Sequence, residues 1–262
     1  MLREKQDTVS PVQTPAANSP GLYRLAGVGV LLSLALGLLD IGLSFGGGDV
    51  PVGTLSAREW FARYQHNWFV GLRNLGFFNV VSPLLTIPLY VALGRLHRRQ
   101  APVGATLALL VFVLGAAVYI SNNRALAMLT LSREYAAAQT PAEMDQLAVA
   151  GTVMLAQAED FTLGTLPGFV LLSAGSLGML AVMLQGRVFG RRLALAGLAG
   201  TSGLLIFTVA VTLVPTVMRP AMLLALAGGL VMMGWDVAMA LAMFRLARPP
   251  ARPAVGVAVP AR

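Results

Sequence analysis

The sequence predicts an all-α protein, a polytopic membrane helix bundle of six transmembrane helices with an extracytoplasmic helical hairpin. Hydrophobic residues make up 56% of the 262 residues and charged residues only 11%, with a mean hydropathy of +0.73, whereas soluble domains carry about 25% charged residues. Six apolar segments are each near or above the roughly 20 residues that cross about 30 Å of hydrocarbon. Lysine and arginine are concentrated in every second connection between these segments, which is the pattern of positive-inside topology.

The six segments divide the chain into a transmembrane domain, residues 21–247, and two short tails. We place the spans at about 22–45, 68–94, 103–122, 161–185, 192–214 and 220–246. Residues 1–20, MLREKQDTVSPVQTPAANSP, are polar and interrupted by proline, and they are too hydrophilic to form a core. We expect residues 1–20 and 248–262 to be disordered cytoplasmic tails.

The distribution of lysine and arginine predicts the orientation. With the N-terminus inside, the inner side receives 13 of them: Arg3, Lys5, Arg24, Arg95, Arg98, Arg99, Arg187, Arg191, Arg192, Arg245, Arg248, Arg252 and Arg262. The outer side receives 5: Arg58, Arg63, Arg124, Arg133 and Arg219. Positive-inside topology therefore places both termini in the cytoplasm. The preference for arginine over lysine is typical of high-GC bacteria, so we expect a multi-pass protein of the cell inner membrane.

The loop after the first segment contains a helix start. In TLSAREWFARYQHNWF, Ser56 is followed three residues later by Glu59, which forms a capping box. The aromatic residues then fall at helical spacing: Trp60, Phe61, Tyr64 and Trp68. Aromatic faces are typical of helices at the membrane–water interface, so we expect an amphipathic helix at the outer interface.

The loop between the third and fourth segments, residues 122–160, predicts the helical hairpin. Thr140 fits an N-cap, with Pro141 at the first helical position and Glu143 at the third. A stripe of apolar residues follows: Met144, Leu147, Met154 and Leu155. We expect the third helix to continue to about Ala137, to turn at Gln139 and Thr140, and to return as a helix toward the fourth segment.

Small residues and prolines mark how the spans pack. Glycines recur in the last three segments and favour close helix approach: Gly175, Gly178, Gly197, Gly200, Gly203, Gly228, Gly229 and Gly234. Pro83 and Pro88 should kink the second segment, because each removes an intrahelical hydrogen bond.

Asp40 and Arg73 are two of three ionisable residues within the expected spans. A charge at the bilayer centre costs about 2.5–3.5 kcal/mol on insertion scales, so each needs a partner, a cavity or a function. By helix rise, both lie about 8 Å from the outer boundary on consecutive antiparallel segments. We predict an ion pair between them, with Asn74 and Asn79 as polar neighbours. A substrate or ion site is the alternative role for these residues.

Asp236 is the third ionisable residue and has no cation at its own depth. It lies about 10 Å deeper than the pair. Trp235, Ser33, Ser202 and Thr201 are candidate hydrogen-bond donors to it. A neutral, hydrogen-bonded aspartate and a proton-carrying aspartate are both compatible with the sequence.

The sequence lacks the residues and motifs that several kinds of catalytic and metal-binding sites require. The chain has no cysteine, and its two histidines, His66 and His97, fall on opposite sides of the membrane. No HExxH, GxSxG or Walker pattern is present. We therefore predict no catalytic residue, no metal and no cofactor. The net charge of +8 is spread in short clusters between spans, which indicates topology and argues against nucleic acid as a partner.

Three stretches together resemble a bacterial family of six-helix membrane proteins catalogued as domain of unknown function 4386. They are the hairpin NNRALAMLTLSREYAAAQTPAEMDQLAVAGTVMLA, the span LGTLPGFVLLSAGSLGMLAVML and the basic RVFGRR, followed by two further spans. The resemblance covers roughly residues 20–247. It implies the six-span arrangement and carries no catalytic residue over to this chain.

Function has three competing interpretations. The first is a non-enzymatic integral membrane protein that acts through lipid or protein contacts, with the hairpin at 122–160 as the surface for a protein partner. The second is a small solute or proton-coupled transporter that uses Arg73, Asp40 and Asp236. The third is an intramembrane enzyme, which would need a groove for a lipid-like substrate near Asp236.

Overall fold

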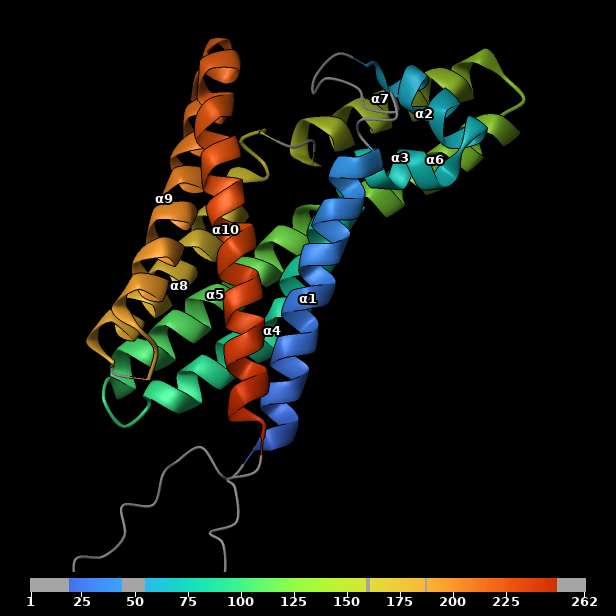
Figure 1. Ribbon diagram of the computed structural model, residues 1–262. Coiled ribbons are helices and arrows are strands. Elements are labelled where there is room, and N and C mark those ends of the chain that lie inside the picture. The colour runs from blue at the N-terminus through green and yellow to red at the C-terminus, as the bar shows by residue number, and fades with distance from the viewer. Residues whose placement is uncertain (1–18, 44–54, 159–160, 187, 249–262) are drawn as a thin grey trace, which may run out of the picture.

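The computed structural model describes residues 19–43, 55–158, 161–186 and 188–248 (Figure 1). Every regular element in these ranges is a helix, and no strand occurs in them. Six helical stretches are long and apolar enough to cross a membrane. The all-α, six-span fold is therefore confirmed, and the chain is a multi-pass membrane protein. The two expected disordered tails lie almost entirely outside the described residues, although Pro20 already begins the first helix.

Six long helices form the membrane bundle. They are α1 (Pro20–Leu43), α4 (Phe77–His97), α5 (Pro102–Asn122), α8 (Leu166–Gln185), α9 (Arg191–Leu213) and α10 (Met218–Leu246), the last preceded by the 3-10 turn η3 (Pro215–Val217). The most extensive packing joins α5 to α8, followed by α1 with α4 and α9 with α10. A core of large side chains from these helices surrounds Leu89, Met179 and Met239.

Glycine permits the close approach of α5 and α8. A Cβ atom at Gly175 would lie 2.4 Å from the backbone nitrogen of Phe112, and one at Gly115 would lie 2.3 Å from that of Leu172. Among the glycines that the sequence singled out, Gly197 and Gly200 also lie against a neighbouring helix. Gly229 and Gly234 have nothing within 4 Å, so the packing role expected for these two is wrong.

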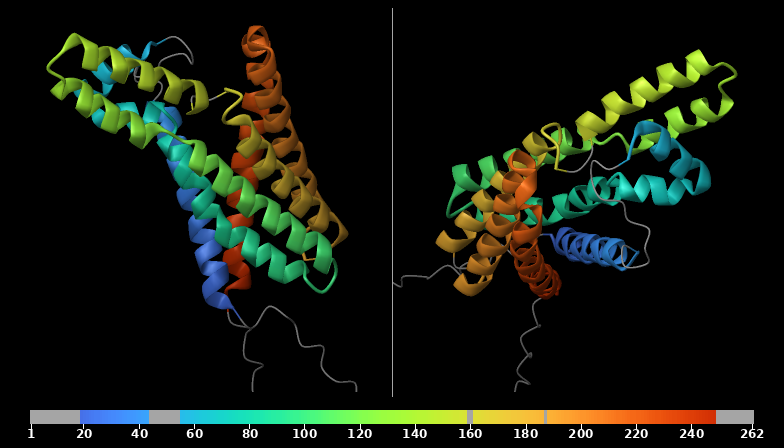
Figure 2. Two further views of the ribbon diagram at one scale, coloured as in Figure 1. Left: turned by 180° about the vertical axis from the view of Figure 1, so that it is seen from behind. Right: turned by 90° about the horizontal axis from the view of Figure 1, so that it is seen from above.

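Four shorter helices form a second unit at one end of the bundle, which we call the head. They are α2 (Ala57–His66), α3 (Trp68–Asn74), α6 (Ala125–Ala137) and α7 (Pro141–Ala158). The head projects sideways from the bundle, and α6 and α7 run antiparallel within it (Figure 2). It has its own buried cluster, which includes Trp60, Phe61, Tyr64 and Met128. We call the bundle end beside it the head end and the opposite end, where α1 begins and α10 ends (Figure 1), the tail end.

The predicted helix starts of the head are confirmed. The Ser56 hydroxyl accepts a hydrogen bond from the Glu59 backbone N–H, and the Glu59 carboxylate accepts one from the Ser56 N–H at 2.6 Å, which completes the capping box. At α7, the Thr140 hydroxyl accepts from the Glu143 N–H at 3.2 Å. These side chains satisfy backbone donors that the first helical turn leaves unpaired.

The aromatic face of α2 does not serve the role that its spacing predicted. Trp60, Phe61 and Tyr64 are buried in the head, and the Tyr64 hydroxyl donates to the Ala125 carbonyl at 2.8 Å. Only Trp68, which begins α3, is exposed. The expectation of an aromatic anchor at the interface is therefore wrong for three of the four rings. Helix α2 is amphipathic, as predicted, but its apolar face packs against the α6–α7 hairpin.

The second span is shorter than predicted. The sequence suggested one helix over 68–94, whereas the structure has α3 and α4 separated at Leu75 and Gly76. Gly76 has a φ of 73°, a left-handed conformation that glycine adopts without a steric cost and that ends a helix. Arg73 therefore lies in α3, before the spanning helix, and the depth measured along one continuous span does not apply to it.

The halves of α1 and α10 nearer the head diverge from each other (Figure 1). The buried residues of α1 all fall between Tyr23 and Val30, and none lies beyond them. Near the tail end the two helices pack closely. A Cβ atom added at Gly27 of α1 would lie 2.8 Å from the ring of Phe244 of α10. Toward the head end, α1 leans to the head while α10 continues along α9 (Figure 1). The result is a V-shaped arrangement of α1 and α10.

Candidate functional site

The head-end half of α1 is tied to the head by an ion pair. Arg73 Nε donates to Asp40 Oδ1 at 2.8 Å. The arginine side chain is only 4% exposed and the aspartate side chain is 36% exposed. Helix α3 positions the arginine: Asn67 Oδ1 accepts from the backbone N–H groups of Phe69 and Val70 and so begins α3. The structure thus places the two residues in contact, at the junction between α1 and the head.

An asparagine side chain joins the α3–α4 break to the α5–α6 break, where the bundle meets the head. Asn123 lies between α5 and α6, and its Nδ2 donates to the carbonyls of Leu75 at 2.9 Å and Gly76 at 3.3 Å. Its Oδ1 accepts from the Ala125 N–H at 3.0 Å. One side chain therefore satisfies backbone groups at both helix breaks. Sequence reasoning missed this role, because nothing local distinguishes Asn123 from another loop asparagine.

A cleft lies inside the bundle, and all six spanning helices contribute to it. Its volume is about 230 Å³. Its polar lining consists of hydroxyl side chains: Ser33 of α1, Ser82 and Thr86 of α4, Ser173 and Ser176 of α8, and Thr201 of α9. Apolar side chains complete it, among them Phe112 of α5 and Met232 of α10. No ionisable side chain belongs to the described lining.

A second cavity of about 220 Å³ adjoins the first toward the head end, sharing Phe169 and Leu204 with it. Asn79, which the sequence proposed as a neighbour of Arg73, lines this cavity with Thr165 and Thr208. Asn74 is the last residue of α3. The two asparagines are thus on different helices, and Asn79 is part of the cavity wall.

The polar lining follows a helical repeat that sequence reasoning also missed. Along α4, the residues Asn79, Ser82, Thr86 and Tyr90 are spaced by three or four positions, which places them on one face. The Tyr90 hydroxyl donates to Ser176 Oγ at 2.6 Å, and its ring stacks on Phe112 with 3.5 Å between centroids. A polar stripe in an otherwise apolar span was the signal available in the sequence.

Asp236 lies on α10 one turn beyond Met232, half-buried and outside the described lining of both cavities. Within the described part of the chain it has no hydrogen bond or ion pair. Of its expected donors, Thr201 donates to Met232 Sδ at 3.5 Å, and Trp235 Nε1 is buried without a hydrogen-bond partner among the described residues. Asp236 is therefore separate from the Asp40–Arg73 pair.

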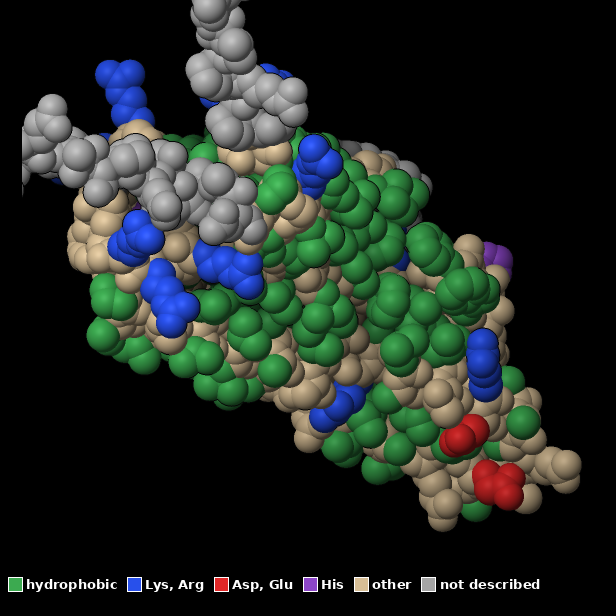
Figure 3. Space-filling model, turned by 90° about the horizontal axis from the view of Figure 1, so that it is seen from below, with side chains coloured by type: hydrophobic (Ala, Val, Ile, Leu, Met, Phe, Trp, Pro, Cys, Tyr) green, Lys and Arg blue, Asp and Glu red, His purple; other side chains and the backbone are tan. Residues whose placement is uncertain are grey.

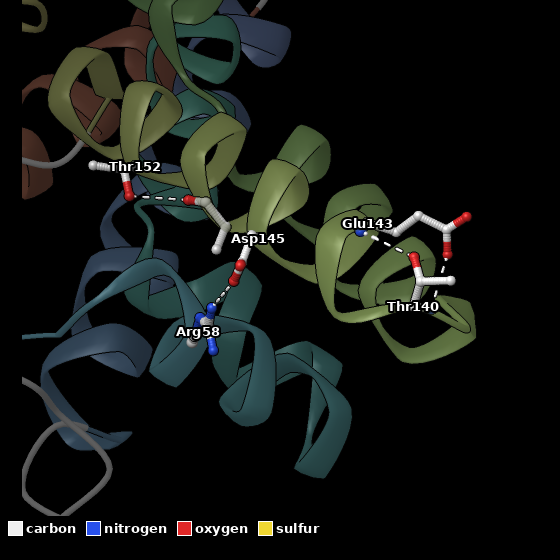
Figure 4. Close-up of polar contacts among 6 residues, drawn as sticks. Arg58, Thr140, Glu143, Asp145 and Thr152 are labelled. Atoms are coloured by element: carbon white, nitrogen blue, oxygen red, sulfur yellow. Dashed lines mark hydrogen bonds and ion pairs between the residues drawn. The ribbon is translucent and has the colours of Figure 1, made fainter.

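The head surface carries its own polar contacts (Figure 4). Arg58 of α2 forms an ion pair with Asp145 of α7. Hydrogen bonds from the backbone N–H groups of Gln139 and Thr140 lower the pKa of the Glu143 carboxyl below its usual range. Bonds from the Ser56 side chain and backbone likewise lower the pKa of Glu59. Both carboxylates cap helices. Hydrogen bonds from the backbone N–H groups stabilise the ionised form of each carboxyl more than the protonated form.

The arrangement offers hydrogen-bonding groups within the cleft. The described residues contain no group of three or more His, Cys, Asp or Glu side chains that could hold a metal ion. The cleft offers hydroxyl groups as donors and acceptors, without an adjacent base that would activate one of them as a nucleophile.

The chain matches a known family model. A family model described as "Domain of unknown function (DUF4386)" matches residues 64–239. No curated protein and no solved structure matches the chain. The matched region begins in α2 and ends in α10, so it includes all of α4, α5, α8 and α9, the larger part of α10 and most of the head.

Proposed function

This chain belongs to the DUF4386 family of domains of unknown function, and from that premise we propose that it is a non-enzymatic membrane protein whose head binds a protein partner. The observation that carries the proposal is the separate buried core of the head. A loop that served only to connect two spans would not need a folded unit of four helices. Folded extramembrane units commonly present an interaction surface.

The contact surface that we propose lies on α7 beside the Arg58–Asp145 ion pair. Val149 is 66% exposed and Val153 is 52% exposed, and they lie one turn apart on this helix. A groove of about 290 Å³ adjoins them, lined by residues of α2 and α7 that include Ala148 and Thr152. Exposed valines beside a charged pair supply the apolar centre and polar rim that protein interfaces use.

We place the head on the extracytoplasmic side of the cell inner membrane and both termini in the cytoplasm. Viewed from the tail end, Lys and Arg side chains surround the end of the bundle, and the visible Asp and Glu side chains lie on the head (Figure 3). At the tail end, Arg98 and Arg99 lie between α4 and α5, and Arg191 and Arg192 begin α9. Positive-inside topology supports this orientation.

Site-specific photocrosslinking tests the partner proposal. With p-benzoylphenylalanine at Val149 or Val153, we expect illumination of intact cells to give one discrete protein adduct shared by both positions. Leu241 is the matched control, because it is equally apolar and 50% exposed but lies within the span α10. The proposal is wrong if the head positions give only the lipid adducts expected at Leu241.

A solute or proton-coupled transporter that uses Arg73, Asp40 and Asp236 is the second candidate. The half-buried Asp236, without a hydrogen bond from the described residues, is the observation that favours it, because intramembrane acids often carry protons. Uptake into proteoliposomes under a pH gradient should then be lost in Asp236→Asn. Equal uptake by this variant and the unmodified protein would remove Asp236 from the mechanism.

A further inference from the structure

We propose that the hydroxyl-lined cleft binds the uncharged polar end of a neutral, single-chain lipid such as a monoacylglycerol, which enters from the membrane between α1 and α10. The proposal depends on the way the cleft is walled, on where it opens and on the chemistry of its lining. It goes beyond the partner surface on the head and uses different residues.

The cleft has the construction of a binding site. Residues from six helices converge on it, so its shape depends on the assembly of the whole bundle. The hydroxyls of Ser176 and Thr86 are oriented by bonds to backbone carbonyls one turn earlier. The side chains of Ser33, Ser82 and Ser173 make no hydrogen bond within the described part of the chain. They line the cavity with unused donors and acceptors, which a ligand with hydroxyl or ester oxygens would satisfy.

The route into the cleft leads from the membrane. Ser33 of α1 and Met232 of α10 both line the cleft, and these two helices diverge toward the head end (Figure 1). The residues beside them are apolar and outward-facing, with Leu32 50% and Leu230 68% exposed. In a bilayer these side chains meet lipid chains. A molecule that enters between α1 and α10 therefore comes from the lipid phase.

The lining selects against charge. An ion transferred into this cleft would lose hydration without meeting an opposite charge in the described lining, which is strongly unfavourable. A purely apolar chain would leave the three serine hydroxyls unsatisfied. A neutral headgroup with hydroxyl and ester groups meets both conditions, and its chain can extend out between α1 and α10 into the lipid. The cavity volume of about 230 Å³ equals that of roughly eight liquid water molecules, which suits a small headgroup.

The Asp40–Arg73 ion pair acts as a positioning contact for the cleft. Asp40 holds the head-end half of α1 to Arg73 of the head, away from α10. The opening thus depends on a contact that lies outside the cleft itself.

Photolabelling in nanodiscs tests the proposal. The purified full chain is reconstituted with a trace of a diazirine-bearing monoacylglycerol and illuminated, and the adducts are mapped by mass spectrometry. We expect saturable labelling of peptides that contain Ser173 or Thr201, competed by unlabelled monoacylglycerol. A fatty acid at neutral pH and free glycerol should not compete, because the first is charged and the second lacks the chain.

Two variants and a control make the result decisive. Ser173→Phe fills the cleft and should abolish saturable labelling. Ser82→Ala removes one of the three hydroxyls that make no hydrogen bond in the described part of the chain, and it should weaken labelling about five-fold, the effect of one lost hydrogen bond. Leu223→Phe is the control, because Leu223 is 73% exposed on α10 outside the cleft. Unchanged labelling in correctly folded Ser82→Ala, or competition by the fatty acid equal to that by the monoacylglycerol, would overturn the proposal. Competition by glycerol alone would assign the cleft to a water-soluble ligand and overturn the lipid source.

Discussion

At the scale of single residues, Asp40 and Arg73 explain how a guanidinium is accommodated in an apolar setting. Arg73 is buried at the end of the short helix α3 and donates to the Asp40 carboxylate of α1. A buried arginine that loses its partner keeps the full cost of dehydration. The pair is thus retained because either residue alone would be unfavourable, even if the pair itself adds little stability.

Charge reversal tests the structural role of this pair. Asp40→Arg or Arg73→Asp alone should lower the yield of monodisperse protein, because each places like charges together. We expect a loss of roughly 1–3 kcal/mol, less than the 3–5 kcal/mol of a fully buried pair, because Asp40 is partly exposed. The double reversal should restore much of the yield, measured by size-exclusion chromatography with fluorescence detection. Arg219→Asp, an exposed arginine on α10, is the control; normal yields in both single variants would refute the role.

The sequence located the charged residues better than the neutral ones. Asp40 and Arg73 could be matched because charges are rare in apolar segments and need a partner there, although the depth estimate for Arg73 assumed one continuous helix that Gly76 interrupts. The function of Asn123 depends on two helix breaks, at Gly76 and at Asn123 itself, that approach each other only in the folded chain. The stripe of Ser82, Thr86 and Tyr90 on α4 had a local signal in its spacing, so a search for polar periodicity within spans would have found that wall of the cleft.

At the scale of helices, local signals predicted where elements begin more reliably than what they contact. The Ser56–Glu59 and Thr140–Glu143 caps are local interactions, and both are present. The break at Gly76 was missed because one glycine within an apolar run is also compatible with a continuous helix. The amphipathic face of α2 was recognised, but its partner could be lipid or protein on periodicity alone. Tertiary contacts with α6 and α7 decided between them.

The packing of α5 against α8 gives a prediction with an internal control. Gly175→Ala should destabilise the bundle, because the new methyl group would lie 2.4 Å from a backbone nitrogen of α5, and backbone atoms cannot rotate away. Overpacking of this kind costs about 1–3 kcal/mol. Gly229→Ala makes the same chemical change on α10 with nothing within 4 Å, so its melting temperature in detergent should be equal or higher. A melting temperature for Gly175→Ala that matches Gly229→Ala would show that α5 and α8 are not closely packed there.

At the scale of the whole molecule, the chain consists of a bundle and a head that meet at one junction. The six-span bundle could be predicted, because the bilayer thickness fixes the length of each apolar segment and the positive-inside rule fixes which connections are basic. The head could be predicted only as a hairpin, since its core joins α2 and α3 to helices about 60 residues later in the sequence. The cleft required the positions of six helices together, and no segment contains it alone.

Cysteine labelling tests the proposed orientation of the whole molecule without background, because the chain has no cysteine of its own. Thr152→Cys on α7 and Gln100→Cys between α4 and α5 change exposed residues at opposite ends. If the head is extracytoplasmic, a membrane-impermeant maleimide added to spheroplasts should label Thr152→Cys at once. It should label Gln100→Cys only after the membrane is permeabilised, since the arginines beside it retain that loop inside. The opposite pattern would reverse the topology, and it would also place the α7 surface before cytoplasmic partners.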